Sequence, residues 1–126
     1  MTHEDVQGWL DRYIEAWRAY DATKIGALFT EDAVYRYHPG DAPVVGRDTI
    51  VAGWLEYEDA DLNKLPWTAE YRPWVVEGDR AIAIGETHYD GAKDFYNCFQ
   101  LVFRDGQCAE FTEWFMEPEE VDAAGG

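Results

Sequence analysis

Apolar residues recur at spacings of three and four residues along the first twenty positions of the chain. This spacing places side chains on one stripe of a helix. The stripe consists of Val6, Leu10, Tyr13, Trp17 and Tyr20. The pattern therefore predicts a helix over about residues 2–20 whose buried side is unusually aromatic.

Two shorter helices and one strand are predicted between this helix and Pro66. Asp21 and Asp48 are residues of the type that caps helix N-termini, and each precedes a short apolar stretch. The two stretches consist of Ile25, Leu28 and Phe29, and of Ile50, Val51, Trp54 and Leu55. Residues 33–38 are aromatic and β-branched and end at a Pro-Gly turn, so they predict a strand. The polar residues 58–66 predict a loop.

Beyond Pro66 the hydrophobic period changes to two, which is typical of strands. Four strands are predicted, over residues 68–76, 80–89, 94–104 and 107–117. The segments between them contain Asp-Gly or Glu-Gly pairs, as antiparallel hairpins require. The expected fold class is α+β, with three N-terminal helices packed on a strongly curved, mainly antiparallel sheet that forms a cone with an internal pocket. Residues 1–118 would form one domain, and residues 119–126 an acidic, Gly-ended disordered tail.

Strand alternation sorts the side chains that would face this pocket, because residues i and i+2 share a face. Four polar residues fall on faces that are otherwise largely apolar. Glu113 lies between Phe111 and Phe115, Asn97 is near Phe99, and Glu86 and His88 follow Ile82 and Ile84 on one face. The same reasoning adds Tyr35 and Tyr37 from the first strand, with Tyr13, Trp17 and Trp54 from the helices as walls.

This set could carry out acid/base chemistry. A carboxylate flanked by Phe side chains loses hydration, which raises its pKa toward neutrality and suits a general acid or base. We therefore expect Glu113 to be the main catalytic group, with His88 as its proton partner and Glu86 as a further candidate. Tyrosine hydroxyls and Asn97 could donate hydrogen bonds to a developing enolate. Aromatic walls favour a flat, largely apolar ligand.

Structural interpretations of the same residues remain open. Glu113 could form a buried ion pair with Arg36, Arg47 or Arg72. Tyr35 and Tyr37 could be core tyrosines with satisfied hydroxyls, and the walls could be ordinary core residues. In that case the cup would be filled by its own side chains.

Composition excludes several classes of partner. The chain has 126 residues, with 10 Lys and Arg against 26 Asp and Glu, for a net charge of −16. This balance argues against nucleic acid and anionic membranes as partners, since both attract a basic surface. No apolar run is long enough to span a membrane and no signal segment is recognisable, so a cytoplasmic location is expected. Cys98 and Cys108 are expected to be reduced thiols.

Other chemistries lack their motifs. The three histidines, His3, His38 and His88, have no metal-ligand spacing, so no metal site is expected. Gly-rich phosphate loops are missing, and no cofactor is expected. The chain contains no serine, which excludes a serine nucleophile.

Three motifs remain to be interpreted: residues 27–35 (Ala-Leu-Phe-Thr-Glu-Asp-Ala-Val-Tyr), residues 45–50 (Val-Gly-Arg-Asp-Thr-Ile), and Asp105-Gly106 leading to residues 111–115 (Phe-Thr-Glu-Trp-Phe). Together they resemble the SnoaL-like branch of the nuclear transport factor two superfamily. The resemblance implies a cone of curved sheet capped by helices and a homodimer formed through the outer sheet face. It covers isomerases, dehydratases, cyclases and epoxide hydrolases, so it implies the fold more sharply than the reaction.

The resemblance carries over only part of each activity. A polyketide cyclase of this type has an acid on its last strand, which Glu113 matches. Limonene epoxide hydrolases have an arginine and an aspartate on the middle strand, and this chain has Glu86 and His88 at those positions. In ketosteroid isomerase the catalytic base stands at the position of Tyr37, so this chain lacks that base. Tyr35, Tyr37 and His88 are loose counterparts of a scytalone-dehydratase-like site.

The preferred hypothesis is a cofactor-independent enzyme that performs cyclisation, dehydration or isomerisation on a small apolar or aromatic molecule. The alternatives are a non-catalytic binding module for an apolar metabolite, and a dimeric interaction domain with a filled core. The outer sheet face of that interaction domain would present Cys98, Val102, Trp114 and Met116.

Overall fold

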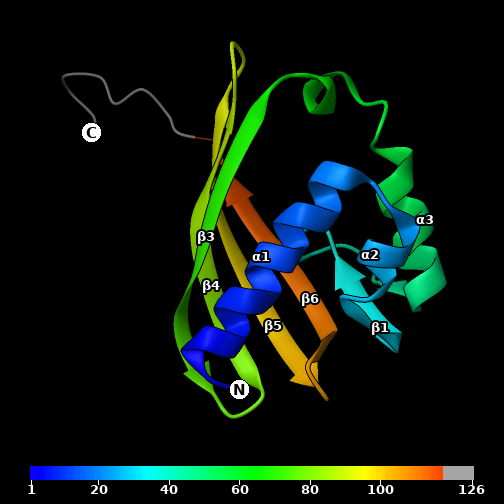
Figure 1. Cartoon of the computed structure of the whole chain (residues 1–126), viewed down its shortest axis with the longest axis vertical. Helices are drawn as coiled ribbons and strands as arrows, with labels where there is room; N and C mark the ends of the chain where they lie inside the picture. Colours follow the sequence, from blue (N-terminus) through cyan, green and yellow to red (C-terminus); the bar gives the residue numbers. More distant parts are fainter. Residues whose placement is uncertain (118–126) are drawn as a thin grey trace.

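The computed structural model describes residues 1–117, so the tail predicted at residues 119–126 lies outside the described residues. The elements are α1 (His3–Ala19), α2 (Ala22–Gly26), β1 (Phe29–Arg36), β2 (Val44–Val45), α3 (Arg47–Glu56), the 3₁₀ helix η1 (Asp61–Lys64), β3 (Trp67–Glu77), β4 (Arg80–Tyr89), β5 (Asp94–Arg104) and β6 (Gln107–Met116). The α+β class is confirmed. The helices lie on one side of a curved sheet (Figure 1).

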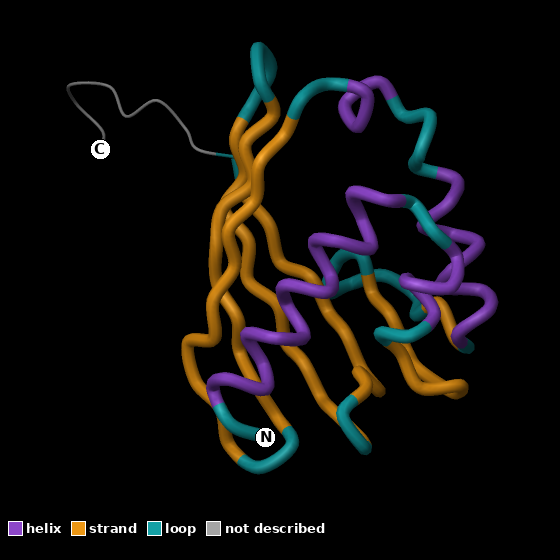
Figure 2. The backbone as a smooth tube through the Cα atoms, viewed as in Figure 1, coloured by secondary structure: helices purple, strands orange, loops and turns teal. Residues whose placement is uncertain are grey.

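The six strands form one mixed sheet in the order β2-β1-β6-β5-β4-β3. β3 to β6 are the predicted antiparallel meander, whereas β1 pairs with β6 in parallel. The sheet is open, because β2 and β3 are its two edges and do not pair with each other. The segment between α3 and β3, which contains η1, arches over one end of the sheet (Figure 2).

Local capping explains where α1 begins and ends. The Thr2 side chain accepts from the Asp5 N–H, and Asp5 accepts from the Thr2 N–H, which is a capping box. Tyr20 ends the helix in the left-handed conformation. The buried stripe includes Trp9, which the sequence pattern did not single out; it donates to Leu28 O at 3.0 Å.

Three local predictions are wrong in detail. α3 begins at Arg47 after Gly46, so Asp48 lies inside the first turn and is not its cap. β1 begins at Phe29, which the sequence placed on a helix. Part of the predicted loop of residues 58–66 is the 3₁₀ helix η1. The Asp21 cap of α2 is confirmed, since its side chain accepts from the Lys24 N–H at 3.0 Å.

An aromatic core fills one end of the space between helices and sheet. Trp9 contacts Phe29, Phe103 and Phe111 with ring centroids 5.6 to 6.2 Å apart. The alternation of β5 and β6 is interrupted between Val102 and Phe103. Strict alternation along β6 would put Cys108 on the same outer face as Trp114 and Met116. Because of the interruption it is instead fully buried in the core opposite Phe103.

Among residues 1–117, no helix is long and apolar enough to cross a membrane.

Candidate functional site

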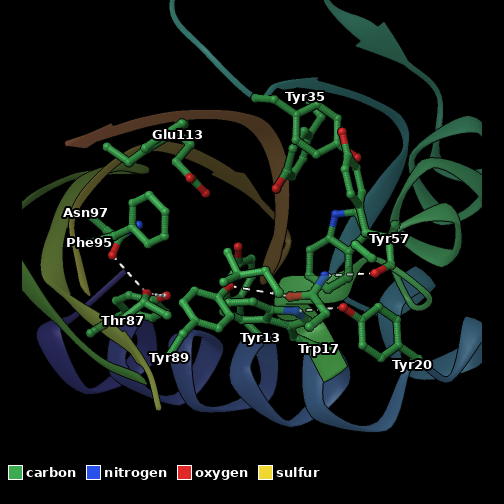
Figure 3. A pocket seen from close by; sticks show the side chains of 17 residues that line it. Tyr13, Trp17, Tyr20, Tyr35, Tyr57, Thr87, Tyr89, Phe95, Asn97 and Glu113 are labelled. Carbon is green, nitrogen blue, oxygen red and sulfur yellow. Dashed lines mark hydrogen bonds between the residues drawn. The ribbon is translucent and has the colours of Figure 1, made fainter. Parts of the chain in front are cut away.

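A cavity of about 380 Å³ lies between the concave face of the sheet and the helices (Figure 3). It is lined by Tyr13, Trp17, Tyr20, Tyr35, Tyr37, Trp54, Tyr57, Ala60, Leu62, Asn63, Tyr71, Thr87, Tyr89, Phe95, Asn97, Glu113 and Phe115. Eleven of these side chains are aromatic, and Glu113 is the one with a formal charge. The cup is therefore not filled by its own side chains, and its volume is in the range that small-molecule sites occupy.

Glu113 turns its carboxylate into this cavity from β6 (Figure 3). The ion pairs of residues 1–117 do not include it. Two of the arginines considered as partners are engaged elsewhere: Arg72 with Glu86 at 3.3 Å, and Arg47 with Phe29 O at 3.0 Å. Burial raises the pKa of Glu113 to about 7, and His38 partly offsets this effect. The carboxyl group can thus both give and take a proton near neutral pH.

Tyr35 and Tyr37 come from β1 and the residue after its end. The Tyr35 ring stacks on Phe111 at 4.4 Å and contacts Tyr37 at 4.7 Å. The Tyr37 hydroxyl is buried and has no hydrogen-bond partner within the described part of the chain. It also lies close to α3, because a Cβ placed on Gly53 would be 3.0 Å from Tyr37 Oη. Burial keeps the pKa of Tyr37 well above its usual value, so the hydroxyl stays protonated and can donate.

A chain of hydrogen bonds positions Asn97 at the opposite wall. Tyr71 Oη contacts Thr87 Oγ1 at 2.5 Å, and Thr87 Oγ1 donates to Asn97 Oδ1 at 2.9 Å. The Thr87 proton is therefore used by Asn97, which makes Tyr71 the donor to Thr87. With its carbonyl oxygen held in this way, Asn97 presents its amide N–H groups to a ligand.

One end of the cavity is lined by residues of α1 and of the segment between α3 and β3. Trp17 Nε1 donates to Tyr20 Oη at 3.0 Å, and the Trp17 ring stacks on Trp67 at 4.1 Å. Tyr89 Oη donates to Asn63 Oδ1 at 3.4 Å, which ties β4 to the arching segment. The arching segment is thus held to the sheet by a hydrogen bond between Tyr89 and Asn63.

The structure brings most of the sequence-predicted site residues together. Those that line the cavity are Glu113, Tyr13, Trp17, Tyr35, Tyr37, Trp54, Asn97 and Phe115. The predicted site residues Phe99 and Phe111 lie on the same strand faces as Asn97 and Glu113 but do not line the cavity. They are 1% and 0% exposed and belong to the core beneath the site.

The predicted inner face of β4 is wrong, and Glu86 and His88 lie outside the cavity as a result. The inner face carries Ala81, Ala83, Gly85, Thr87 and Tyr89 instead. The prediction took the face with Ile82 and Ile84 as the inner one because it is apolar, but the outer face of this sheet also carries large apolar side chains.

Both displaced residues have partners on the outer face. Glu86 is exposed and pairs with Arg72. His88 is exposed, contacts Asp94 through Nδ1 and lies 3.7 Å from Asp90 through Nε2. The hydrogen bond to Asp94 raises the pKa of His88. Neither residue is placed to exchange a proton with Glu113.

Several lining residues were not among the site residues predicted from the sequence, although Tyr20 was placed on the buried stripe of the first helix and Phe95 on the face of Asn97. They are Tyr20, Tyr57, Ala60, Leu62, Asn63, Tyr71, Thr87, Tyr89 and Phe95. Gly85 was an available signal, because a glycine inside a strand often marks a close backbone approach. Here a Cβ on Gly85 would lie 2.0 Å from Glu70 O and 2.6 Å from the Tyr71 ring. Recognising this would have identified the correct face of β4.

Comparison with known proteins identifies relatives of this fold. The model of the SnoaL-like domain family matches residues 10–111. No curated protein matches the chain.

Three solved structures illustrate the likeness. A candidate ketosteroid isomerase from Kribbella flavida is 17% identical, with 98% of this chain and 85% of that chain covered and a TM-score of 0.70. A LEH-like epoxide hydrolase from M. tuberculosis is 13% identical, with coverages of 90% and 84% and a TM-score of 0.67. A candidate polyketide cyclase from Sinorhizobium meliloti is 19% identical, with coverages of 90% and 100% and a TM-score of 0.69. At these identities the likeness shows the fold alone.

Proposed function

Because the chain belongs to the SnoaL-like domain family, we propose that its cavity binds an apolar or aromatic metabolite and performs cofactor-independent acid/base chemistry on it. The reaction class is cyclisation, dehydration or isomerisation, each of which needs a proton removed from one atom and delivered to another. Glu113 is the proton carrier.

The observation that supports this proposal is a carboxylate in an aromatic cavity that has no ion-pair partner among residues 1–117. With a pKa of about 7, Glu113 is present in both protonation states near neutrality, which is the condition for efficient general acid/base catalysis. The Tyr37 hydroxyl and the Asn97 amide are donors that can stabilise negative charge developing on a substrate oxygen. His88 takes no part, since it lies on the outer face.

A nitrobenzisoxazole tests the base function without knowledge of the natural substrate. This flat aromatic compound loses a C–H proton to a base, its ring N–O bond breaks, and a coloured nitrophenolate carrying a nitrile is formed. We expect kcat/KM to rise with pH through about 7 and then level off. Glu113→Gln should lower kcat/KM by about 100-fold or more.

Matched controls separate Glu113 from the other acids. Glu110→Gln changes the same residue type on the same strand, but its side chain is exposed on the outer face. Together with His88→Gln it should leave the rate unchanged. A Glu113→Gln variant that is folded and as active as the native chain would refute the catalytic assignment.

Binding without turnover is the alternative outcome of the same experiment. In that case a ligand that enters the cavity quenches the fluorescence of Trp17 and Trp54, which line it, and is recovered unchanged.

We also propose a second copy of this chain as a partner, bound through the outer face of the sheet. Large apolar side chains lie on this face, and Tyr96, Trp114 and Met116 are each at least half exposed there. Cys98 is paired with Ile84 on one side and with Trp114 on the other. A chain with a charge of −16 that keeps such a face apolar is expected to cover it.

A further inference from the structure

The lining of the cavity is unusual for a site that binds only neutral apolar molecules. Eleven side chains present aromatic rings, while Ala60 and Leu62 are the only aliphatic ones. Aromatic faces are negatively polarised and attract cations, best of all Trp and Tyr faces. Lys, Arg and His do not occur among the lining residues. The lining of the cavity therefore offers negative π-faces and one carboxylate, and contains no positive group that would repel a cation.

We infer that the ligand of this cavity carries an organic ammonium group, either a protonated amine or a quaternary ammonium, on an apolar body, with the cation placed between the aromatic faces and the Glu113 carboxylate. The inference rests on the proposed function, because it names the substrate class of the same cavity. It adds that this metabolite carries a positive charge on its apolar body.

The tyrosines that face Glu113 do not neutralise its negative charge. Tyr13 of α1, Tyr35 and Tyr37 of β1 and its end, Tyr71 of β3 and Tyr89 of β4 are electrostatically coupled to it, and all five are neutral when protonated. His38 is the group whose positive charge reaches Glu113, and it is exposed and paired with Asp41 at 2.8 Å. An ammonium ion in the cavity would supply the missing counter-charge. It would also keep Glu113 ionised and therefore able to act as a base.

The aromatic cluster of Trp17 and Trp67 already binds one cation of this chain. The Arg18 guanidinium lies over the Trp67 ring at 4.1 Å, and Trp67 stacks on Trp17, whose ring lines the cavity. The same kind of contact is available on the cavity side of the cluster.

The surroundings of the cavity favour the approach of a cation. The arching segment contributes Tyr57, Ala60, Leu62 and Asn63 to the lining. Interleaved with them are the exposed acids Glu56, Glu58, Asp59 and Asp61, against one basic residue, Lys64. A negative field at an opening raises the local concentration of positive ligands and their association rate.

Two probes of the same shape test the inference: phenyltrimethylammonium, which carries a fixed charge, and tert-butylbenzene, which is neutral. Binding to the native chain is measured by tryptophan fluorescence and calorimetry. We expect the cation to bind about tenfold or more tightly than the neutral probe at about pH 8. Between about pH 8 and pH 6 the affinity for the cation should fall by about tenfold, because Glu113 becomes protonated, while that for tert-butylbenzene should not change.

Variants identify the group responsible. Glu113→Gln should remove most of the preference for the cation and its pH dependence, whereas Glu110→Gln should preserve both. Equal affinities for the two probes in the native chain, or no binding of the cation, would overturn the inference.

The outcome is separable from that of the proposed function. Turnover of the nitrobenzisoxazole without cation preference leaves the base function in place and refutes the ammonium ligand. Cation preference without turnover supports the ammonium ligand and refutes catalysis.

Discussion

Glu113 couples the protonation of the site to the stability of the fold. Its pKa lies at about 7 in the folded chain against an ordinary value of 4.5, so between these values the folded chain holds a proton that the unfolded chain has released. The free energy of unfolding therefore decreases as pH rises through this range and levels off above it. The full difference corresponds to about 3 kcal/mol. A charge needed for function thus destabilises the fold at neutral pH.

Glu113→Gln should remove this loss of unfolding free energy, since the amide does not ionise. Relative to the native chain, the variant should gain about 2–3 kcal/mol of unfolding free energy between about pH 5 and pH 8. Urea denaturation at a series of pH values measures the difference, in which the contributions of other titrating groups cancel. Glu110→Gln serves as the control. A difference that does not change with pH would show that Glu113 is not buried as a carboxylate.

The buried hydroxyl of Tyr37 has no hydrogen-bond partner in the part of the chain that the structure describes, which destabilises the fold unless a ligand bonds to it. Tyr37→Phe should leave stability unchanged or raise it by up to about 1 kcal/mol, while kcat/KM for the nitrobenzisoxazole falls by roughly tenfold. Tyr96→Phe, at an exposed position on the outer face, should change neither. A clear loss of stability in Tyr37→Phe would mean that the hydroxyl is bonded within the folded chain.

At the scale of elements, β4 shows how backbone contact determines a strand's orientation. Ala81, Ala83 and Gly85 face inward because the space above them is occupied, at Gly85 by Glu70 O and Tyr71 of the neighbouring strand. The larger Ile82 and Ile84 therefore lie on the outer face.

Gly85→Ala should be destabilising by about 1–3 kcal/mol, because its Cβ would overlap a backbone oxygen and a ring that lines the cavity. Thermal and urea unfolding measure the loss. Gly40→Ala is the matched control, since a Cβ at Gly40 meets nothing within 4 Å. Equal stability of the two variants would contradict the close approach of β3 at Gly85.

At the scale of the whole molecule, an acidic segment and a face with exposed apolar side chains lie at different places on the surface. Exposed acids gather on the arch beside the cavity, while the outer sheet face carries Trp114, Tyr96 and Met116. This arrangement leaves the cavity accessible in a dimer that uses the outer face. The cytoplasmic location and the homodimer stay predictions.

Light scattering after size exclusion tests the dimer. The native chain should have twice the 14.5 kDa mass of one chain, and Trp114→Glu should shift it to a single chain, because a charge would be buried at the interface. Val45→Glu, at an exposed apolar position on the edge strand β2, should leave the mass unchanged. A native chain that is monomeric at high concentration would refute the proposed interface.

The sequence by itself determined the three α-helices and the five longer strands, the bounds of β4 and β5, and the position of Glu113 on an inward face of β6. These follow from local rules: periodicity, Asp-Gly turns, and a carboxylate between two Phe side chains in a strand whose alternation is regular from Phe111 onward. Tyr13, Tyr35 and Asn97 were placed correctly by the same rules.

Only the tertiary structure decided which face of β4 is inside, that Cys108 turns into the core, and that the arch with Tyr57 and Asn63 completes the cavity. The physical reason is that β4 carries apolar residues on both of its faces, with the larger ones, Ile82 and Ile84, pointing outward, so hydrophobicity along the strand does not distinguish the faces. The inner face of β4 is determined by contacts with atoms distant in sequence, such as Glu70 O next to Gly85. No local sequence pattern encodes the positions of these atoms.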